Sequence, residues 1–420
     1  MNVQYISNKL SQTDYILLGL SVLYMSHNSP YVGGRMPAMF YASVVVLLFV
    51  LVCIKLARFQ NIIRFIIPIF SLYFLDIIFI QSHNINSLEG IMRLLSGMMQ
   101  ILIYPLLASY AINKGNVKLA MWLLVLLLSV EFTIYFTSIM AESEIPGIIR
   151  MNPGQLRDND EMMYAMKTSM NVGNFDTVYG CATLVPIGIL LIKWRSDLFA
   201  NKLYQLLTVM TTAMMIYFVY VSQFTTALVG TLIMSLTIVC PKYLSLSYFK
   251  KTIWLGLLAV ILTWSVLPPV LHIIADSVDS EIMAERFEGI AITLEGGNDS
   301  GSLDVELRKA AYEKPLQAIS STLMLGTWSG YGSGGHSYLL DTVGKYGIIG
   351  VILLLVYYKS ILKLFYSPYK NEPWVHYYLY GLLGVTFFYA FNPSELFQQV
   401  LFCYPLSAFL IKNKLNQRCK

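Results

Sequence analysis

Long apolar runs, separated by short polar connections, recur along the whole chain. The runs from Met36 to Ile54 and from Leu119 to Met140 have the length of about 20 residues that a helix needs to cross a bilayer. The same pattern predicts twelve membrane spans, near residues 14–26, 36–54, 62–80, 92–112, 119–140, 174–192, 203–219, 223–240, 252–267, 337–357, 374–390 and 396–411. The first run is the weakest, because its apolar core is much shorter than 20 residues.

Composition supports this interpretation. Of the 420 residues, 56% are hydrophobic and 13% are charged, whereas soluble proteins carry roughly a quarter charged residues. This balance excludes a disordered chain, a secreted disulfide scaffold and almost any soluble enzyme of this length. The five cysteines lack the paired spacing of a disulfide framework or a zinc site. The expected fold class is an all-α integral membrane protein with about 12 transmembrane helices.

Basic residues divide unevenly between the two faces that these spans define. The connections on the N-terminal side hold 19 of the 29 lysines and arginines, and the opposite side holds 10. Because positive charge stays on the cytoplasmic side, we expect both termini in the cytoplasm. The net charge of +5 therefore reflects topology, and we expect no nucleic-acid partner.

Two outer segments, Ala141–Gly173 and Pro268–Gly335, are longer than a connection needs. In the second, apolar residues at helical spacing from Met283 onward predict an amphipathic helix. A further helix is predicted over 303–325, bent or broken at Pro315. Long ordered loops are usually functional, so we expect the chemistry in this periplasmic loop.

The chain is thus expected to have three parts. Residues 1–267 hold the first nine transmembrane helices, residues 268–336 form the large periplasmic loop, and residues 337–420 hold the last three helices and a cytoplasmic tail.

A glycine-rich run ends the large loop and leads into the tenth predicted span. Gly330, Gly332 and Gly335 have the G-x-G-x-x-G spacing of dinucleotide-binding proteins, but that motif needs a preceding strand, and here a membrane helix follows. Gly334 and Gly335 still let backbone amides approach a ligand, at a helix N-terminus that favours anions. His336 stands at this junction as a candidate base, the alternative being a solvated or capping histidine.

Two arginines of the same loop are candidate phosphate ligands. Arg308 follows Asp304 by one helical turn, and Arg286 has Glu285 and Glu288 close by, so each could instead form an ion pair on a solvated helix. A guanidinium kept in an acidic loop beside a glycine–histidine turn nevertheless suits bidentate binding of pyrophosphate.

Asp76 and Glu131 are acidic residues inside predicted spans, in their outward halves. Intramembrane acids are functional candidates by default, and a buried structural hydrogen bond is the alternative for both.

The motif residues of the loop occur in a fixed order: Arg308, Leu325-Gly326, the His336-Ser-Tyr-Leu339 element and Gly347-Ile-Ile-Gly350. This order, with a dozen spans and one large outer loop, resembles the Wzy-type polysaccharide polymerase and O-antigen ligase superfamily of bacterial inner membranes. Arg286-Phe-Glu288 is similar to a second arginine element of the polymerases. The resemblance implies a GT-C-like arrangement of helices.

The resemblance also implies an activity. The protein would be a glycosyltransferase that polymerises lipid-linked repeat units, moving the growing glycan from undecaprenyl pyrophosphate to an acceptor hydroxyl on another lipid-linked unit. No metal or other cofactor is expected, because pyrophosphate is already a good leaving group. Expected partners are membrane lipid, a chain-length regulator and a flippase. The expected site residues are His336 as catalytic base and, for substrate binding, Arg308, Arg286, Arg150, Arg157, Gly334, Gly335 and Tyr338.

One stretch departs from the family pattern. The family usually has a basic residue in a Ser-x-x-Arg/Lys stretch after the seventh span, whereas this chain has Thr225 at that position of Ser222–Leu228. A further phosphate-binding arginine would then be Arg150 or Arg157, or would be missing.

Two other functions stay open from the residues alone. The first is an O-antigen ligase that transfers finished glycan to the lipid A core. The second, of a different class, is a transporter or flippase of lipid-linked oligosaccharides, which the lack of a visible internal repeat disfavours.

Overall fold

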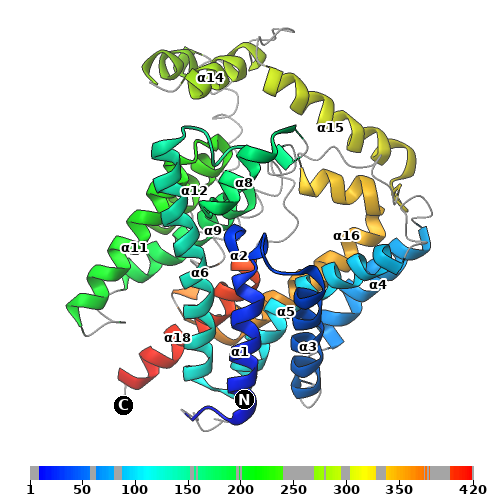
Figure 1. Cartoon of the computed structure of the whole chain (residues 1–420), viewed down its shortest axis with the longest axis vertical. Coiled ribbons are helices and arrows are strands. Elements are labelled where there is room, and N and C mark those ends of the chain that lie inside the picture. The colour runs from blue at the N-terminus through cyan, green and yellow to red at the C-terminus, as the bar shows by residue number, and fades with distance from the viewer. Residues whose placement is uncertain are drawn as a thin grey trace. The chain divides into compact units, whose positions relative to one another are not determined.

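The structure is a computed structural model of the chain (Figure 1). It describes residues 9–56, 63–79, 88–151, 156, 157, 159–194, 198, 201–239, 269–278, 281–294, 303–327, 337–372, 374, 375, 378 and 398–418. Throughout this part of the chain the regular structure is helical, with no strand. The chain forms two compact units. Unit 1 comprises residues 1–235, 349–388 and 394–420, and unit 2 comprises 236–348 and 389–393.

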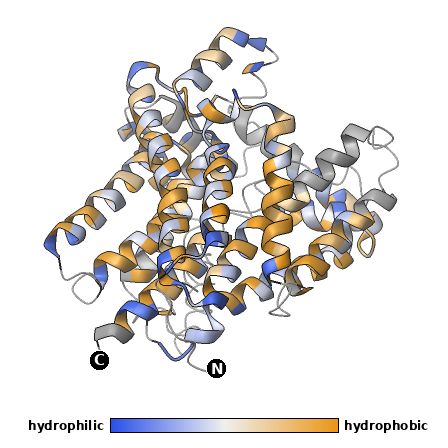
Figure 2. Cartoon of the chain, turned by 60° about the horizontal axis from the view of Figure 1, so that its bottom comes forward, coloured by the Kyte–Doolittle hydropathy of each residue, from blue (hydrophilic) through white to orange (hydrophobic). Residues whose placement is uncertain are grey.

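Unit 1 contains most of the long helices. Its elements are α1 (Gln12–Ser26), α2 (Pro30–Gly33), α3 (Ala38–Leu56), α4 (Ile63–Phe79), α5 (Leu88–Lys114), α6 (Val117–Glu144), α8 (Glu161–Ser169), α9 (Phe175–Lys193), α11 (Lys202–Val221), α12 (Thr225–Val239), the short 3-10 helix η4 (Ser367–Tyr369) and α18 (Gln398–Arg418). Figure 2 shows that the long helices are apolar over most of their length, with hydrophilic residues gathered at helix ends and turns.

In the part of the chain that the structure describes, five helices are long and apolar enough to cross a membrane: α3, α6, α9, α11 and α16 (Tyr338–Phe365). The protein is therefore a multi-pass membrane protein. Helices also occupy the predicted runs at 14–26 and 223–240, but α1 and α12 have only 15 residues each in the described part. The predicted span at 252–267 lies outside the described residues, as does most of 374–390.

The helices of unit 1 pack through small residues and aromatic rings. A Cβ on Gly188 of α9 would lie 2.5 Å from Oγ1 of Thr212 in α11, so these backbones approach closely, as small residues permit in membranes. Tyr135 of α6 stacks on Phe218 of α11 with ring centroids 4.8 Å apart.

Ion pairs join helix ends that the charge pattern assigns to the cytoplasmic face. The carboxylate of Asp14 at the start of α1 accepts hydrogen bonds from Nζ of Lys114 (2.5 Å) and from the hydroxyl of Tyr110 (3.0 Å). Lys412 of α18 pairs with Glu372 in the same way. Each of these contacts joins segments that the sequence analysis places on one face.

Contacts at the opposite helix ends join segments predicted to lie outside. The amide oxygen of Asn171 accepts from the hydroxyl of Ser29 (2.7 Å) and from the backbone N–H of Tyr31 (3.2 Å). The hydroxyl of Thr137 donates to the backbone carbonyl of Asn171 (2.9 Å). These bonds tie α2 and α6 to the first outer segment.

Unit 2 contains a helical segment at 269–277, α14 (Glu281–Leu294), α15 (Leu303–Thr322) and the start of α16. Both helices predicted in the large loop are therefore present. α15 continues through Pro315, so of the two predicted alternatives, a bend or a break, the break does not occur.

α16 has an interruption that the sequence analysis did not anticipate. Gly347 has φ 62° and ψ −168°, which is not helical, so a first helix of 338–346 gives way to a second one there. The run expected to form one straight span from residue 337 thus begins with a separate short helix.

Candidate functional site

The structure describes only some of the predicted site residues. His336, Gly334 and Gly335 lie outside the described residues. Arg286 lies on α14 and Arg308 on α15, and the side chains of both are outside the described part. The other three predicted residues are described. Tyr338 is the first residue of α16, Arg157 is exposed, and Arg150 is half-buried.

A close contact between two glycines brings together the motif elements on either side of the glycine–histidine run. Gly326 has φ 71° and Gly347 has φ 62°, a conformation that side chains disfavour. A Cβ on Gly326 would lie 2.4 Å from the backbone nitrogen of Gly347. A Cβ on Gly347 would lie 2.5 Å from the carbonyl oxygen of Met324. Only glycine fits at both positions.

Two backbone hydrogen bonds flank this contact, and we call the whole arrangement the glycine clasp. The N–H of Thr327 donates to the carbonyl of Gly344, and the N–H of Ile348 donates to the carbonyl of Leu323, both over 3.0 Å. The clasp brings Thr327 close to Gly344. The predicted base, His336, lies between these two residues in the sequence.

The helix predicted to begin after His336 does begin there. Ser337 is buried, and its side-chain hydroxyl accepts a hydrogen bond from the N–H of Leu340 (3.3 Å). Its carbonyl accepts from the N–H of Asp341 (2.8 Å). Ser337 thus caps α16 in the way that serine favours, and the helix N-terminus follows His336 directly.

A histidine–carboxylate pair in unit 2 was not predicted. Nδ1 of His272 lies 2.6 Å from Oε2 of Glu288, joining segment 269–277 to α14. The sequence analysis treated Glu288 only as a neighbour of Arg286. The two partners are 16 residues apart on different helices, so no local pattern signals their contact. A carboxylate that orients an imidazole makes His272 a second candidate base.

Arg150 lies beside Ser222–Leu228, the stretch in which this chain has Thr225 instead of the basic residue of the polymerase pattern. Its guanidinium carbon is 5.8 Å from the centroid of the Phe224 ring, a cation–π contact. Phe224 immediately precedes Thr225, and its ring also packs on Phe175 and Tyr179. Arg150 therefore brings positive charge to the α11–α12 turn.

Two buried charged side chains fasten the turn that carries Arg150. The carboxylate of Glu142 accepts from the N–H groups of Gly147 (2.5 Å) and Ile149 (3.0 Å). Nζ of Lys167 donates to the carbonyls of Ile148 (2.8 Å), Ile149 (3.1 Å) and Met151 (2.6 Å). Burial lowers the pKa of Lys167 to about 8, although the charge of Glu142 acts in the opposite direction.

Of the two acids predicted inside the membrane, Asp76 and Glu131, the structure describes the side chain of Glu131 only. The side chain of Asp76 lies outside the described part of α4. Glu131 is buried in α6, and its carboxylate accepts a hydrogen bond from the hydroxyl of Tyr135 over 2.9 Å. This bond supports the structural alternative for Glu131. Within the described ranges, no group of histidine, cysteine and acidic side chains could hold a metal ion.

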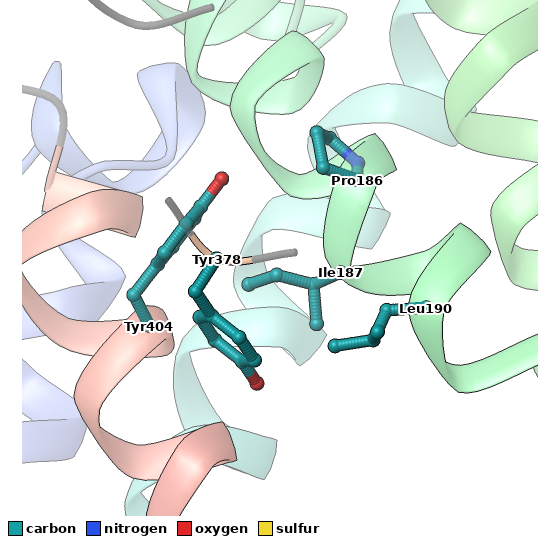
Figure 3. Close-up of a pocket in the computed structure, with 5 residues that line it drawn as sticks. All are labelled: Pro186, Ile187, Leu190, Tyr378 and Tyr404. Atoms are coloured by element: carbon teal, nitrogen blue, oxygen red, sulfur yellow. The ribbon is translucent and has the colours of Figure 1, made fainter. Parts of the chain in front are cut away.

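One small pocket in unit 1 is a packing seam. Figure 3 shows the rings of Tyr378 and Tyr404 beside Ile187 and Leu190 of α9. The pocket leaves no room for a water molecule. The hydroxyl of Tyr404 donates to the carbonyl of Thr183 (3.0 Å), in the turn before Pro186. This bond supports the backbone where proline interrupts the helical ladder.

In comparisons with known proteins, neither a family model nor a curated protein matched the chain.

Proposed function

We propose that the protein is a glycosyltransferase that polymerises lipid-linked oligosaccharides at the outer face of the bacterial inner membrane. The observation that supports this most is the glycine clasp. It joins Leu325-Gly326 to the Gly347–Gly350 element, two of the motif parts on which the resemblance to the polysaccharide polymerases rests. A clasp at this place gives the intervening glycine–histidine segment fixed ends.

The proposed chemistry needs positive charge and one base. Arg308 and Arg286 bind the donor pyrophosphate, and the N-terminus of α16 adds oriented N–H groups beside it. Preorganised charge of this kind stabilises a departing phosphate by several kcal/mol. His336 takes the proton of the acceptor hydroxyl, whose oxygen attacks the donor's anomeric carbon while pyrophosphate leaves. Direct attack inverts the anomeric configuration and requires no metal.

The test uses purified protein with synthetic undecaprenyl-pyrophosphate-linked repeat units. The wild-type protein should form polymer with an inverted linkage, read by NMR. Because a positioned base contributes about 10²–10⁴-fold in rate, His336→Ala should lose that much turnover. Arg308→Lys keeps the charge but loses the bidentate geometry, so it should also lose most activity while still accumulating in the membrane.

Three results would contradict this proposal, the first two its mechanism and the third the polymerase activity itself. They are retention of configuration, full activity of Arg308→Ala, and transfer of single glycans only to lipid A core. The last of these would identify the ligase instead.

A further inference from the structure

An open apolar groove is lined mainly by residues of α11 and α12. Its volume is about 720 Å³, and α9 contributes to its floor. The walls include Ala213, Tyr217 and Tyr220 of α11 and Leu228 and Leu232 of α12. Because the walls are almost wholly apolar, the groove suits a hydrocarbon chain.

The groove spans about two thirds of the depth of one membrane leaflet. Along α11 it extends from Tyr220, at the turn, to Ala213, a rise of roughly 10 Å at 1.5 Å per residue. Half of the hydrocarbon core measures about 15 Å. If a methylene group occupies about as much space as a water molecule, ~30 Å³, the volume holds roughly two dozen such groups. That is enough for one acyl chain and too little for a whole polyprenyl chain.

The open end of the groove carries positive charge. Tyr220 and Leu228 flank the α11–α12 turn, and Arg150 contacts Phe224 within that turn. Tyr217 and Tyr220 are exposed at the same end, where tyrosines favour the membrane interface. A guanidinium at this turn and an apolar groove that ends at the same turn match a lipid whose phosphate lies at the interface and whose chain lies in the groove.

We propose that this groove binds one acyl chain of an anionic glycerophospholipid from the leaflet at the Arg150 end, with Arg150 holding the lipid phosphate. Glu142 and Lys167 hold the backbone of the Arg150 turn, so the guanidinium is presented from a fixed support. This proposal assigns Arg150, a candidate pyrophosphate ligand by sequence, to a membrane lipid instead, whereas the proposed transferase chemistry uses Arg308, Arg286 and His336.

The test counts retained lipids on the full-length protein. Protein in nanodiscs of phosphatidylglycerol and phosphatidylcholine in equal amounts is delipidated stepwise and measured by native mass spectrometry. The wild-type protein should retain one phosphatidylglycerol per chain. Arg150→Gln should retain it about tenfold less, because a charge-assisted hydrogen bond is lost, and Arg150→Lys should lie between. Arg35→Gln is the matched control, since Arg35 also stacks on an aromatic ring, 3.8 Å from the centroid of Tyr31.

A second pair of variants tests the groove itself. Ala213→Phe fills the groove and should abolish retention, whereas Val209→Phe, exposed on the same helix outside the groove, should leave it unchanged. The proposal is overturned by unchanged retention in Arg150→Gln or Ala213→Phe, or by equal retention of phosphatidylcholine. A polyprenyl phosphate retained from native membranes in place of phosphatidylglycerol would also overturn it.

Discussion

Nζ of Lys167 lies 2.6 Å from the carbonyl oxygen of Met151, and this is one of three hydrogen bonds by which Lys167 holds the backbone of the turn that carries Arg150. Such burial of a lysine is unusual in an outer segment, since Lys167 is only 3% exposed. Its ammonium group is solvated by backbone carbonyls instead of water, which gives the turn a measurable dependence on pH.

The pH prediction follows from the pKa of Lys167, which burial lowers from 10.5 to about 8. Between these values the folded chain has lost the proton while the unfolded chain still binds it, so the contribution of Lys167 to stability rises with pH. The free energy of unfolding of the wild type, relative to Lys167→Met, should increase by up to about 3 kcal/mol from pH 7.5 to 10.5.

Lys314→Met is the control for this measurement, because Lys314 is exposed on α15 and should give a flat difference. A difference for Lys167 that falls as the pH rises would contradict the buried-ammonium interpretation.

The glycine clasp predicts strong and specific effects of single methyl groups. Gly326→Ala and Gly347→Ala each place a Cβ within 2.6 Å of backbone atoms at positive φ, so each should destabilise unit 2 by more than about 2 kcal/mol and abolish polymer formation. Proteolytic cleavage of the large loop measures the opening.

Substitutions at two other glycines distinguish the effect of backbone strain at positive φ from the effect of close contact with the added Cβ. Gly115 has φ 66° but no atom within 4 Å of its Cβ position, so Gly115→Ala measures the backbone strain alone. Gly19 lies in α1 with open space around it, and Gly19→Ala should be neutral or stabilising. If Gly347→Ala behaved like Gly115→Ala, close contact would not be the reason for glycine.

The two candidate bases can be distinguished kinetically. With His336 as the base, His272→Gln should keep turnover within about tenfold of the wild type, whereas His336→Ala should fall by 10²-fold or more. Glu288→Gln provides the matched control, because it removes the negative charge from the same 2.6 Å contact. Losses of about 10³-fold in both His272→Gln and Glu288→Gln would transfer the role of base to His272.

The predicted sidedness can be tested by cysteine labelling in intact cells, in a variant without native cysteines. Ser320 on α15 and Asn371 after η4 are both exposed, so burial does not limit the reaction at either position. Ser320→Cys should react with an impermeant reagent, and Asn371→Cys should react only after permeabilisation. The reverse pattern would invert the topology.

Sequence predicted the helices well because run length alone decides whether a segment can cross a bilayer. α3, α6, α9 and α11 follow the predicted runs closely. The interruption of α16 could not be predicted, because glycine is common within membrane helices and the positive φ of Gly347 depends on the contact with Gly326.

Features of the candidate site were predictable only where a short stretch of the sequence signals them by itself. Ser337 caps α16 directly after the histidine, as a helix start signal suggests. The burial of Lys167 had no such signal, because its partners are backbone carbonyls, which every residue has. The contact between His272 and Glu288 depends on how two helices pack.

The ion pair between Asp14 and Lys114 has a consequence for biogenesis. Asp14 is completely buried, and its partner follows 100 residues later in the chain. At about 5–20 residues per second, a ribosome needs roughly 5–20 s to supply it. An unpaired carboxylate at a helix end is costly in a membrane, and α1 has only 15 residues. α1 therefore reaches its final position only after the end of α5 has been synthesised.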